Sequence, residues 1–166
     1  VYAKNPKAAA SLSTSLQQGK IEKWYQAEIC GKPVDNNGTY VDYLKQDKKN
    51  NCSRIVDKSD PDGKRAELEY KVLDCMQTEE KDPQYLSLVE IKLLTGRHHQ
   101  IRVQFSGHGT PLYGDGKYGN NEKAVRKSLA LCACHLRFKH PATGRIMDFQ
   151  IKPDTGAFKL FSKNIS

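Results

Sequence analysis

The 166-residue sequence has no apolar run close to the roughly 20 residues that a membrane-spanning helix needs, so we expect no membrane partner. Its opening segment, VYAKNPKAAA, contains no apolar signal core, which predicts that no secretory leader is present. The opening also lacks an initiator Met, which suggests a fragment or a processed chain. Five cysteines are an odd number in a chain without a leader, and this favours reduced thiols and a cytoplasmic location.

Acidic residues are scarce in the second half of the chain. Residues 1–83 contain 14 Lys/Arg and 14 Asp/Glu, whereas residues 84–166 contain 13 Lys/Arg and 5 Asp/Glu, so the whole net charge of +8 arises in the second half. A one-sided basic excess is typical of proteins that bind a polyanion. It is equally compatible with a solvated basic face, and charge alone does not decide between the two.

The spacing of potential metal ligands also falls short of a known pattern. His98, His99, Cys132 and Cys134 are the obvious candidates, but a C-x-C pair beside distant histidines is not the C-x2–4-C pair of structural zinc. We therefore expect no metal.

The polar and apolar pattern predicts an α+β fold. Asn5 and Pro6 suit the start of a short amphipathic helix, and Gly19 suits the position just past its end. Alternation predicts strands over 21–31, 66–73, 86–94, 130–141 and 145–152. Residues 33–63 are polar and rich in turn residues, and predict at most a weak strand.

The segment 101–105 fits either a strand or a helix that stops at Gly107, and periodicity does not decide between them. Several strands, few helices and no regular β-α alternation predict a mixed, mostly antiparallel sheet with a few flanking helices. No repeat or linker divides the chain, so we expect one domain over residues 1–166.

The most informative stretch is LLTGRHHQIRVQFSGHGTPLYGDGKYG, residues 93–119. Thr95-Gly96-Arg97 places a fixed cation at a turn, and the residues that follow concentrate hydrogen-bond donors. A run of glycines comes next, so the backbone can bend sharply and approach a ligand closely. The pattern predicts a positively charged pocket edge followed by a glycine-rich loop.

This stretch resembles the motif of the RluA-like pseudouridine synthases, L-x-TGR-x-HQIR-x-H followed by G-H-P-I-x-GD-x-x-YG. Similar segments occur in the family's order along the chain: VYAKNPKAA, KWYQA with Gly31, AELEYKVL, and LCA followed by Leu136, Phe138 and His140-Pro141. The sequence departs from the pattern at Gln104 and Cys132, where the family often has His, and at Gly109-Thr110, which adds a residue. The family's catalytic H-R-L-D motif occurs nowhere in the chain; in the family it lies just upstream of the segment that begins here at Val1.

The resemblance implies the pseudouridine synthase core fold, here its C-terminal portion, and conversion of uridine to pseudouridine in ribosomal or transfer RNA without a cofactor. It implies that Arg97 pairs with the catalytic aspartate and keeps it ionised. It also implies that Tyr25 stacks on the flipped uracil and removes the C5 proton. The strand pattern alone favours a core position for Tyr25 among Ile21, Ala27 and Ile29.

Most candidate RNA contacts lie in the basic second half of the chain, with Lys23 in the first half. We expect them at Lys23, His99, Gln100, Arg102, Lys117, Arg137 and Lys139, with Lys123, Arg126 and Lys127 as further phosphate contacts. Gln100 and Arg102 could equally support the turn. His135, Arg137 and Lys139 would share one strand face as a basic stripe. Asp115 is expected to brace the loop.

Three functional hypotheses remain open from the sequence. The first is a pseudouridine synthase whose 166 residues alone are inactive, because the catalytic aspartate motif lies upstream of Val1. The second is a non-catalytic RNA-binding module that retains the fold. The third and weakest is a hydrolase built on His98 or His99 with Asp115. We expect a monomer that binds RNA.

Overall fold

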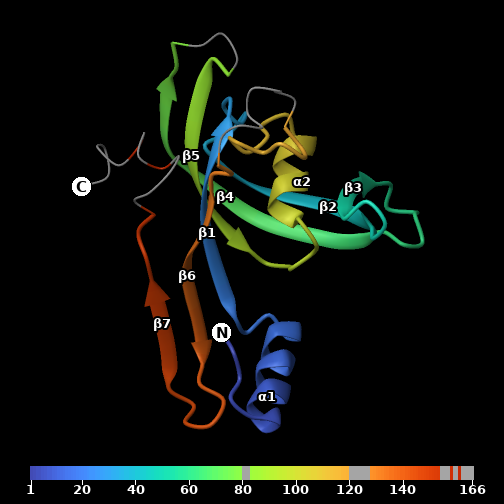
Figure 1. Cartoon of the computed structure of the whole chain (residues 1–166), viewed down its shortest axis with the longest axis vertical. Coiled ribbons are helices and arrows are strands. Elements are labelled where there is room, and N and C mark those ends of the chain that lie inside the picture. The colour runs from blue at the N-terminus through green and yellow to red at the C-terminus, as the bar shows by residue number, and fades with distance from the viewer. Residues whose placement is uncertain (80–82, 120–127, 154–157, 159–160, 162–166) are drawn as a thin grey trace.

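The computed structural model describes residues 1–79, 83–119, 128–153, 158 and 161. Seven strands in this part of the chain form one sheet in the order β3-β2-β4-β5-β1-β6-β7, and every pairing is antiparallel (Figure 1). The elements are α1 (Pro6–Gln17), β1 (Glu22–Cys30), β2 (Asn37–Asp47), β3 (Cys52–Val56), β4 (Lys64–Gln77), β5 (Tyr85–Leu93), α2 (Gln100–Gly107), β6 (Leu131–Lys139) and β7 (Ile146–Gln150). The predicted α+β class is confirmed.

Helix α1 begins and ends where the sequence predicts. The Asn5 side chain accepts a hydrogen bond from the backbone N–H of Ala8 at 2.8 Å, and Pro6 follows at the first helical position. Gly19 has a φ of +67°, which a residue without a side chain adopts at no steric cost. No residue of α1 is buried, and the helix lies at one end of the structure, away from α2 (Figure 1).

Residues 33–63 contain more regular structure than predicted. The expectation of at most a weak strand is wrong, because β2 and β3 form a hairpin whose strand β2 pairs along β4. The hydrophobic pattern missed it because a strand near the edge of a sheet has few core contacts and is commonly polar. Backbone pairing such as Tyr40 with Leu68 and Asp42 with Ala66 defines the strand instead.

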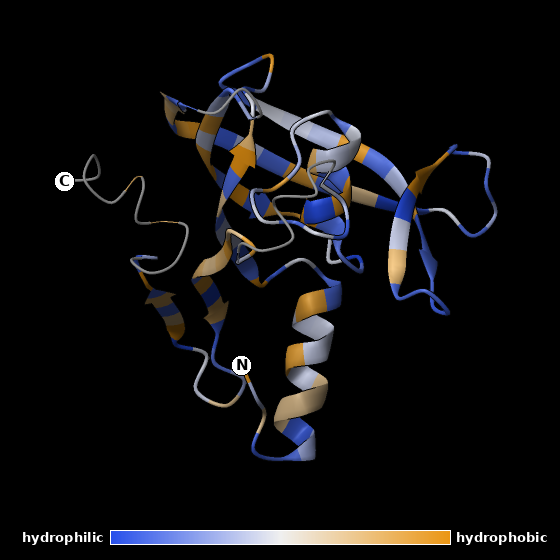
Figure 2. Ribbon diagram, turned by 45° about the horizontal axis from the view of Figure 1, so that its top comes forward, coloured by the Kyte–Doolittle hydropathy of each residue, from blue (hydrophilic) through white to orange (hydrophobic). Residues whose placement is uncertain are grey.

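Helix α2 settles the segment that periodicity left open. Ile101 and Phe105, one turn apart, are both buried against the sheet. They join a core that includes Ala27, Leu68 and Val89, each fully buried. Figure 2 shows the alternation of polar and apolar residues along the strands that frame this core. α2 therefore covers the face of the sheet to which Tyr25 and Ala27 belong.

The opposite face of β1 contains a buried acidic residue, Glu28, whose burial the sequence pattern does not predict. Glu28 pairs with Leu88 in the neighbouring strand and is fully buried; Leu88 belongs to an apolar cluster that includes Phe158 and Phe161. Neither carboxylate oxygen of Glu28 has a hydrogen-bond partner among the residues that the structure describes. Burial disfavours the charged form and raises the pKa of Glu28 to about 7.

This buried carboxyl makes stability depend on pH. The pKa of Glu28 is higher in the folded chain than in the unfolded one, so its contribution to stability is present at low pH. It is lost as the pH rises from about 4.5 to about 7. We expect Glu28→Leu to raise the free energy of unfolding at pH 8 by up to about 3 kcal/mol and to gain less at pH 5. Thermal unfolding across this range measures the effect.

The matched control is Glu69→Leu, which changes an exposed glutamate of β4 in the same way. It should leave the pH dependence of unfolding as it is in the parent chain. A Glu28→Leu variant with unchanged or lower stability at pH 8 would show that the Glu28 carboxylate is not strained by burial.

Candidate active site

A buried amide side chain shapes the turn that contains Arg97. Gln100 is 3% exposed, and its Oε1 accepts hydrogen bonds from the Thr95 hydroxyl at 2.8 Å and the Arg97 backbone N–H at 2.9 Å. Its Nε2 donates to the Glu67 carbonyl at 3.1 Å and to Gln104 Oε1 at 3.0 Å. Both amide hydrogens of Gln100 are therefore engaged inside the protein, and none is free for RNA.

Arg97 itself lies exposed at the turn. Its Nε donates to the Arg65 carbonyl at 2.9 Å, which fixes the direction of the side chain. Arg97 forms no ion pair with any residue that the structure describes. The two terminal nitrogens of the guanidinium can therefore form a two-pronged contact with a carboxylate or phosphate.

Tyr25 and Lys23 lie on the same face of β1 as the core beneath α2, because residues two apart in a strand share a face. Tyr25 is half-buried against that core, and burial raises the pKa of its hydroxyl. The Lys23 ammonium lies close to Gly96, 3.5 Å from where a Cβ on that glycine would sit. Burial lowers the pKa of Lys23. Lys23 thus connects the strand of Tyr25 to the turn of Arg97.

A second set of contacts braces the loop after α2. Arg102 donates to both oxygens of Asp115, from Nε at 2.8 Å and from Nη2 at 2.7 Å. Asp115 Oδ1 also accepts the backbone N–H groups of Lys117 and Tyr118, each at 2.9 Å. Burial alone would raise the pKa of Asp115, but these hydrogen bonds outweigh it and the pKa lies below its usual value. Asp115 braces the loop, as the sequence predicts.

His99, at the start of α2, has the left-handed φ of 52°, and its Nδ1 lies 2.9 Å from the Tyr118 hydroxyl. Burial, and then the neighbouring positive groups, lower the pKa of His99. His98 instead contacts Ser53 Oγ at 3.0 Å and Asn51 Oδ1 at 3.1 Å. Neither histidine is hydrogen-bonded to Asp115, whose carboxylate is held by Arg102 and two backbone amides, so the structure does not form the His–Asp pair that the hydrolase hypothesis needs.

The remaining predicted RNA contacts that the structure describes lie in two places. Lys117 donates to the Asn51 carbonyl at 2.8 Å and so holds the β2–β3 hairpin. Arg137 and Lys139 project from the face of β6 opposite to Tyr25, by strand alternation from their pairing with β1. Arg137 is 3.9 Å from Asp148, which also bonds His135 at 2.7 Å. The predicted contacts Lys123, Arg126 and Lys127 lie outside the described residues.

Gln104 was recognisable in the sequence only as a departure from the family pattern. It is fully buried, and its Nε2 donates to Asp42 Oδ2 at 2.8 Å. Asp42 also contacts His108 Nε2 at 3.1 Å, and the His108 ring stacks on Tyr40 at 3.8 Å. Gln104 therefore extends the Gln100 contacts into β2, a link between distant segments that strand and helix periodicity does not reveal.

The described residues contain neither a cluster of metal ligands nor a membrane-spanning helix. No group of three or more His, Cys, Asp or Glu side chains lies close enough together there to hold a metal ion. No helix in the same part of the chain is both long and apolar enough to cross a membrane.

The described residues form an α+β fold with a single antiparallel sheet, and α2 packs on one face of it. A sequence model described as RNA pseudouridylate synthase matches residues 1–107. The chain belongs to the RNA pseudouridylate synthase family, and the predicted RluA-like resemblance is confirmed.

Individual relatives agree with this assignment. The chain is 36% identical over 150 residues to the uncharacterized RNA pseudouridine synthase YlyB of Bacillus subtilis, covering 90% of this chain and 46% of that protein. It is 34% identical over 157 residues to the ribosomal large subunit pseudouridine synthase D of Zymomonas mobilis, covering 90% and 47%. The chain therefore spans about half the length of the curated relatives it matches.

A solved structure shows the same fold. The human RNA pseudouridylate synthase domain containing 1 superimposes with a TM-score of 0.75 at 24% identity, covering 92% of this chain and 62% of that one.

The ion pair between Arg102 and Asp115 provides a test of the braced loop. Asp115→Asn keeps the size of the side chain but leaves the Arg102 guanidinium without its carboxylate, so we expect a loss of about 3 kcal/mol in the free energy of unfolding. Chemical denaturation at neutral pH measures it. The control is Asp148→Asn, which removes the charge of a 45% exposed side chain paired with His135. We expect this variant to lose less than about 1 kcal/mol in the free energy of unfolding. Equal losses in both variants would contradict the bracing role.

Proposed function

We propose that these residues form part of an RNA pseudouridine synthase that isomerises uridine in structured RNA. The observation that carries the proposal is the Arg97 turn, whose backbone is held by Gln100 while its terminal guanidinium nitrogens have no described partner. Lys23 and Tyr25 lie on the face of the sheet from which this turn projects. Family membership supplies the reaction to which this arrangement is suited.

In the proposed reaction an aspartate acts as nucleophile through a transient bond to the nucleotide, which breaks again before the product leaves, and the N1–C1′ bond of the uridine breaks. The uracil turns, C5 bonds to C1′, and the C5 proton leaves while N1 gains one. Substrate and product are isomers, so no oxidant or reductant is consumed. Arg97 keeps the aspartate ionised, and Tyr25 packs against the flipped base and accepts the C5 proton.

The roles of the other predicted residues follow from their contacts. Gln100, Arg102 and His99 position the Arg97 turn and the loop after α2, because their hydrogen bonds are to neighbouring protein groups. Lys23 contacts RNA beside the turn. Ribosomal RNA is the favoured substrate class, because three of the relatives' names describe ribosomal large subunit pseudouridine synthases. The proposed location is cytoplasmic.

The nucleophilic aspartate is not among the 166 residues in this proposal. Asp115, the one acid in the motif segment, is committed to Arg102 and two backbone amides. The chain by itself should therefore bind RNA without turnover.

Tritium release from RNA labelled at C5 of uridine tests the proposal directly. The 166-residue chain should release none, while a protein that joins it to an upstream segment containing the H-R-L-D motif should release tritium from its target RNA. Release by the 166 residues alone would contradict the missing-nucleophile proposal. RNA binding without release by the longer protein would establish the non-catalytic RNA-binding module instead.

Two conservative variants of the longer protein test the residue roles. Arg97→Lys keeps the positive charge but loses the two-pronged contact, and Tyr25→Phe keeps the ring but loses the hydroxyl. We expect each to lower the rate of tritium release by about 100-fold or more while RNA affinity changes less than about threefold. Tyr2→Phe, at a 99% exposed tyrosine, is the control and should retain full activity. Equal losses of affinity and rate would assign both residues to RNA binding alone.

A further inference from the structure

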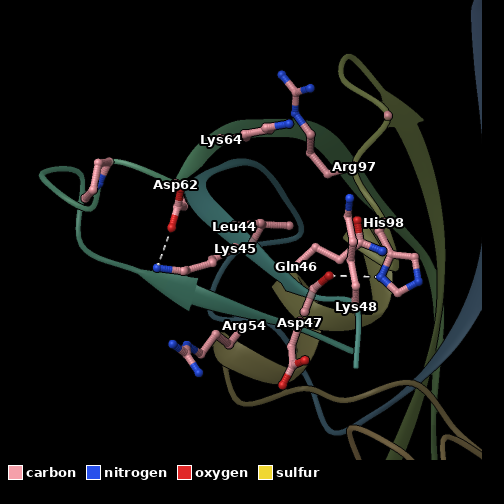
Figure 3. A pocket seen from close by; sticks show the side chains of 13 residues that line it. Leu44, Lys45, Gln46, Asp47, Lys48, Arg54, Asp62, Lys64, Arg97 and His98 are labelled. Carbon is pink, nitrogen blue, oxygen red and sulfur yellow. Dashed lines mark hydrogen bonds and ion pairs between the residues drawn. The ribbon is translucent and has the colours of Figure 1, made fainter. Parts of the chain in front are cut away.

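A hollow of about 830 Å³ lies beside the Arg97 turn, between that turn and the β2–β3 hairpin (Figure 3). Its walls come from the end of β2, from β3, from the start of β4 and from residues 96–98. The sequence pattern does not assign a function to the segment 33–63, which supplies most of the residues that line the hollow. The hollow therefore joins an unassigned segment to the Arg97 turn.

The lining of the hollow is strongly cationic. It includes the side chains of Lys45, Lys48, Arg54, Lys64 and Arg97 against only two acids, Asp47 and Asp62, a balance of five minus two or +3. Figure 3 shows Lys64 and Arg97 close together on one rim, with Arg54 and Asp47 on the other side.

The two acids are already engaged. Asp62 is paired with Lys45 at 2.9 Å, and Asp47 accepts hydrogen bonds from the backbone N–H groups of Lys49 and Asn50. Lys48, Arg54 and Lys64 form no hydrogen bond or ion pair through their side chains with any described residue. These three exposed cations are available to an anionic ligand, and they line the hollow beside Arg97.

Hydrogen bonds hold the β2–β3 hairpin against the Arg97 turn and the loop after α2. His98 bonds Ser53 and Asn51, and Lys117 donates to the Asn51 carbonyl. The backbone N–H of Ser53 also donates to the Tyr118 hydroxyl at 2.8 Å. The cations of β2 and β3 therefore keep a defined position relative to Arg97, and an anion bound to them would lie next to the Arg97 turn.

Among the described residues that line the hollow, none is Phe, Tyr or Trp. Its one aromatic ring, the imidazole of His98, is already stacked on His99 and hydrogen-bonded to Ser53 and Asn51, so charged side chains dominate the lining. Lysine and arginine side chains without aromatic partners are the usual contacts to phosphate oxygens. We propose that the hollow binds the phosphodiester backbone of the RNA strand that flanks the target uridine, and that the β2–β3 hairpin is an RNA-binding arm. This inference rests on the proposed function and extends it to a specific surface.

The test uses the 166-residue chain and a fluorescein-labelled, uridine-containing RNA hairpin. The variant combines Lys48→Gln, Arg54→Gln and Lys64→Gln, which leaves Arg97 intact. The matched control combines Lys4→Gln, Lys7→Gln and Lys20→Gln, which removes the same charge from exposed residues in and beside α1, at the other end of the structure (Figure 1). Thermal unfolding verifies that both variants are folded.

We expect the hollow variant to bind the RNA at least tenfold more weakly than the parent chain at moderate salt. The slope of log Kd against log salt concentration should fall by about 2, because three phosphate contacts are lost. The control variant should change affinity less than threefold. In the longer, active protein the hollow variant should raise KM for RNA, with a much smaller effect on kcat.

Three outcomes would overturn the inference while leaving the proposed function intact. They are unchanged affinity and salt slope in the hollow variant, equal losses in both variants, and displacement of the RNA by uridine monophosphate alone, which would indicate a mononucleotide site. Failure of the parent chain to bind RNA, with no tritium release by the longer protein, would instead remove the proposed function itself.

Discussion

The buried side chain of Gln100 is the contact on which the site depends. Its oxygen holds the Thr95 hydroxyl and the Arg97 amide, and its nitrogen holds the Glu67 carbonyl and Gln104. A buried amide that lost these partners would carry the full cost of desolvation, about 1–3 kcal/mol for each unsatisfied group. The Arg97 turn, the start of β4 and helix α2 are therefore fixed relative to one another.

Further hydrogen bonds connect helix α2 to strand β2 and to the loop that follows the helix. Gln104, one turn along α2, carries them to Asp42 of β2, while Arg102, two residues after Gln100, secures Asp115 and the loop after the helix. Tyr118 in that loop then bonds both His99 and the hairpin at Ser53. Segments far apart in the sequence thus form one polar network, and the exposed guanidinium of Arg97 lies at its surface.

The local features of the fold could be predicted from sequence because they arise from neighbours along the chain. The cap at Asn5 and the alternation of β4 are examples. The β2–β3 hairpin and Glu28 were not predictable, because a polar edge strand and a buried acid depend on partners distant in sequence. The motif resemblance singled out Arg97 and Tyr25, but only the contacts show that Gln100 and Arg102 are bound within the protein.

In the proposed function, Arg97 and Tyr25 face a uridine that is extruded from the RNA. The most direct test is a crystal structure of the longer protein with a target RNA that carries 5-fluorouridine, because fluorine at C5 cannot leave as a proton and should arrest the reaction. We expect the base against the Tyr25 ring, Arg97 paired with a carboxylate, and phosphates in the hollow beside the hairpin. A base bound on another face of the sheet, with Arg97 facing solvent, would contradict the account.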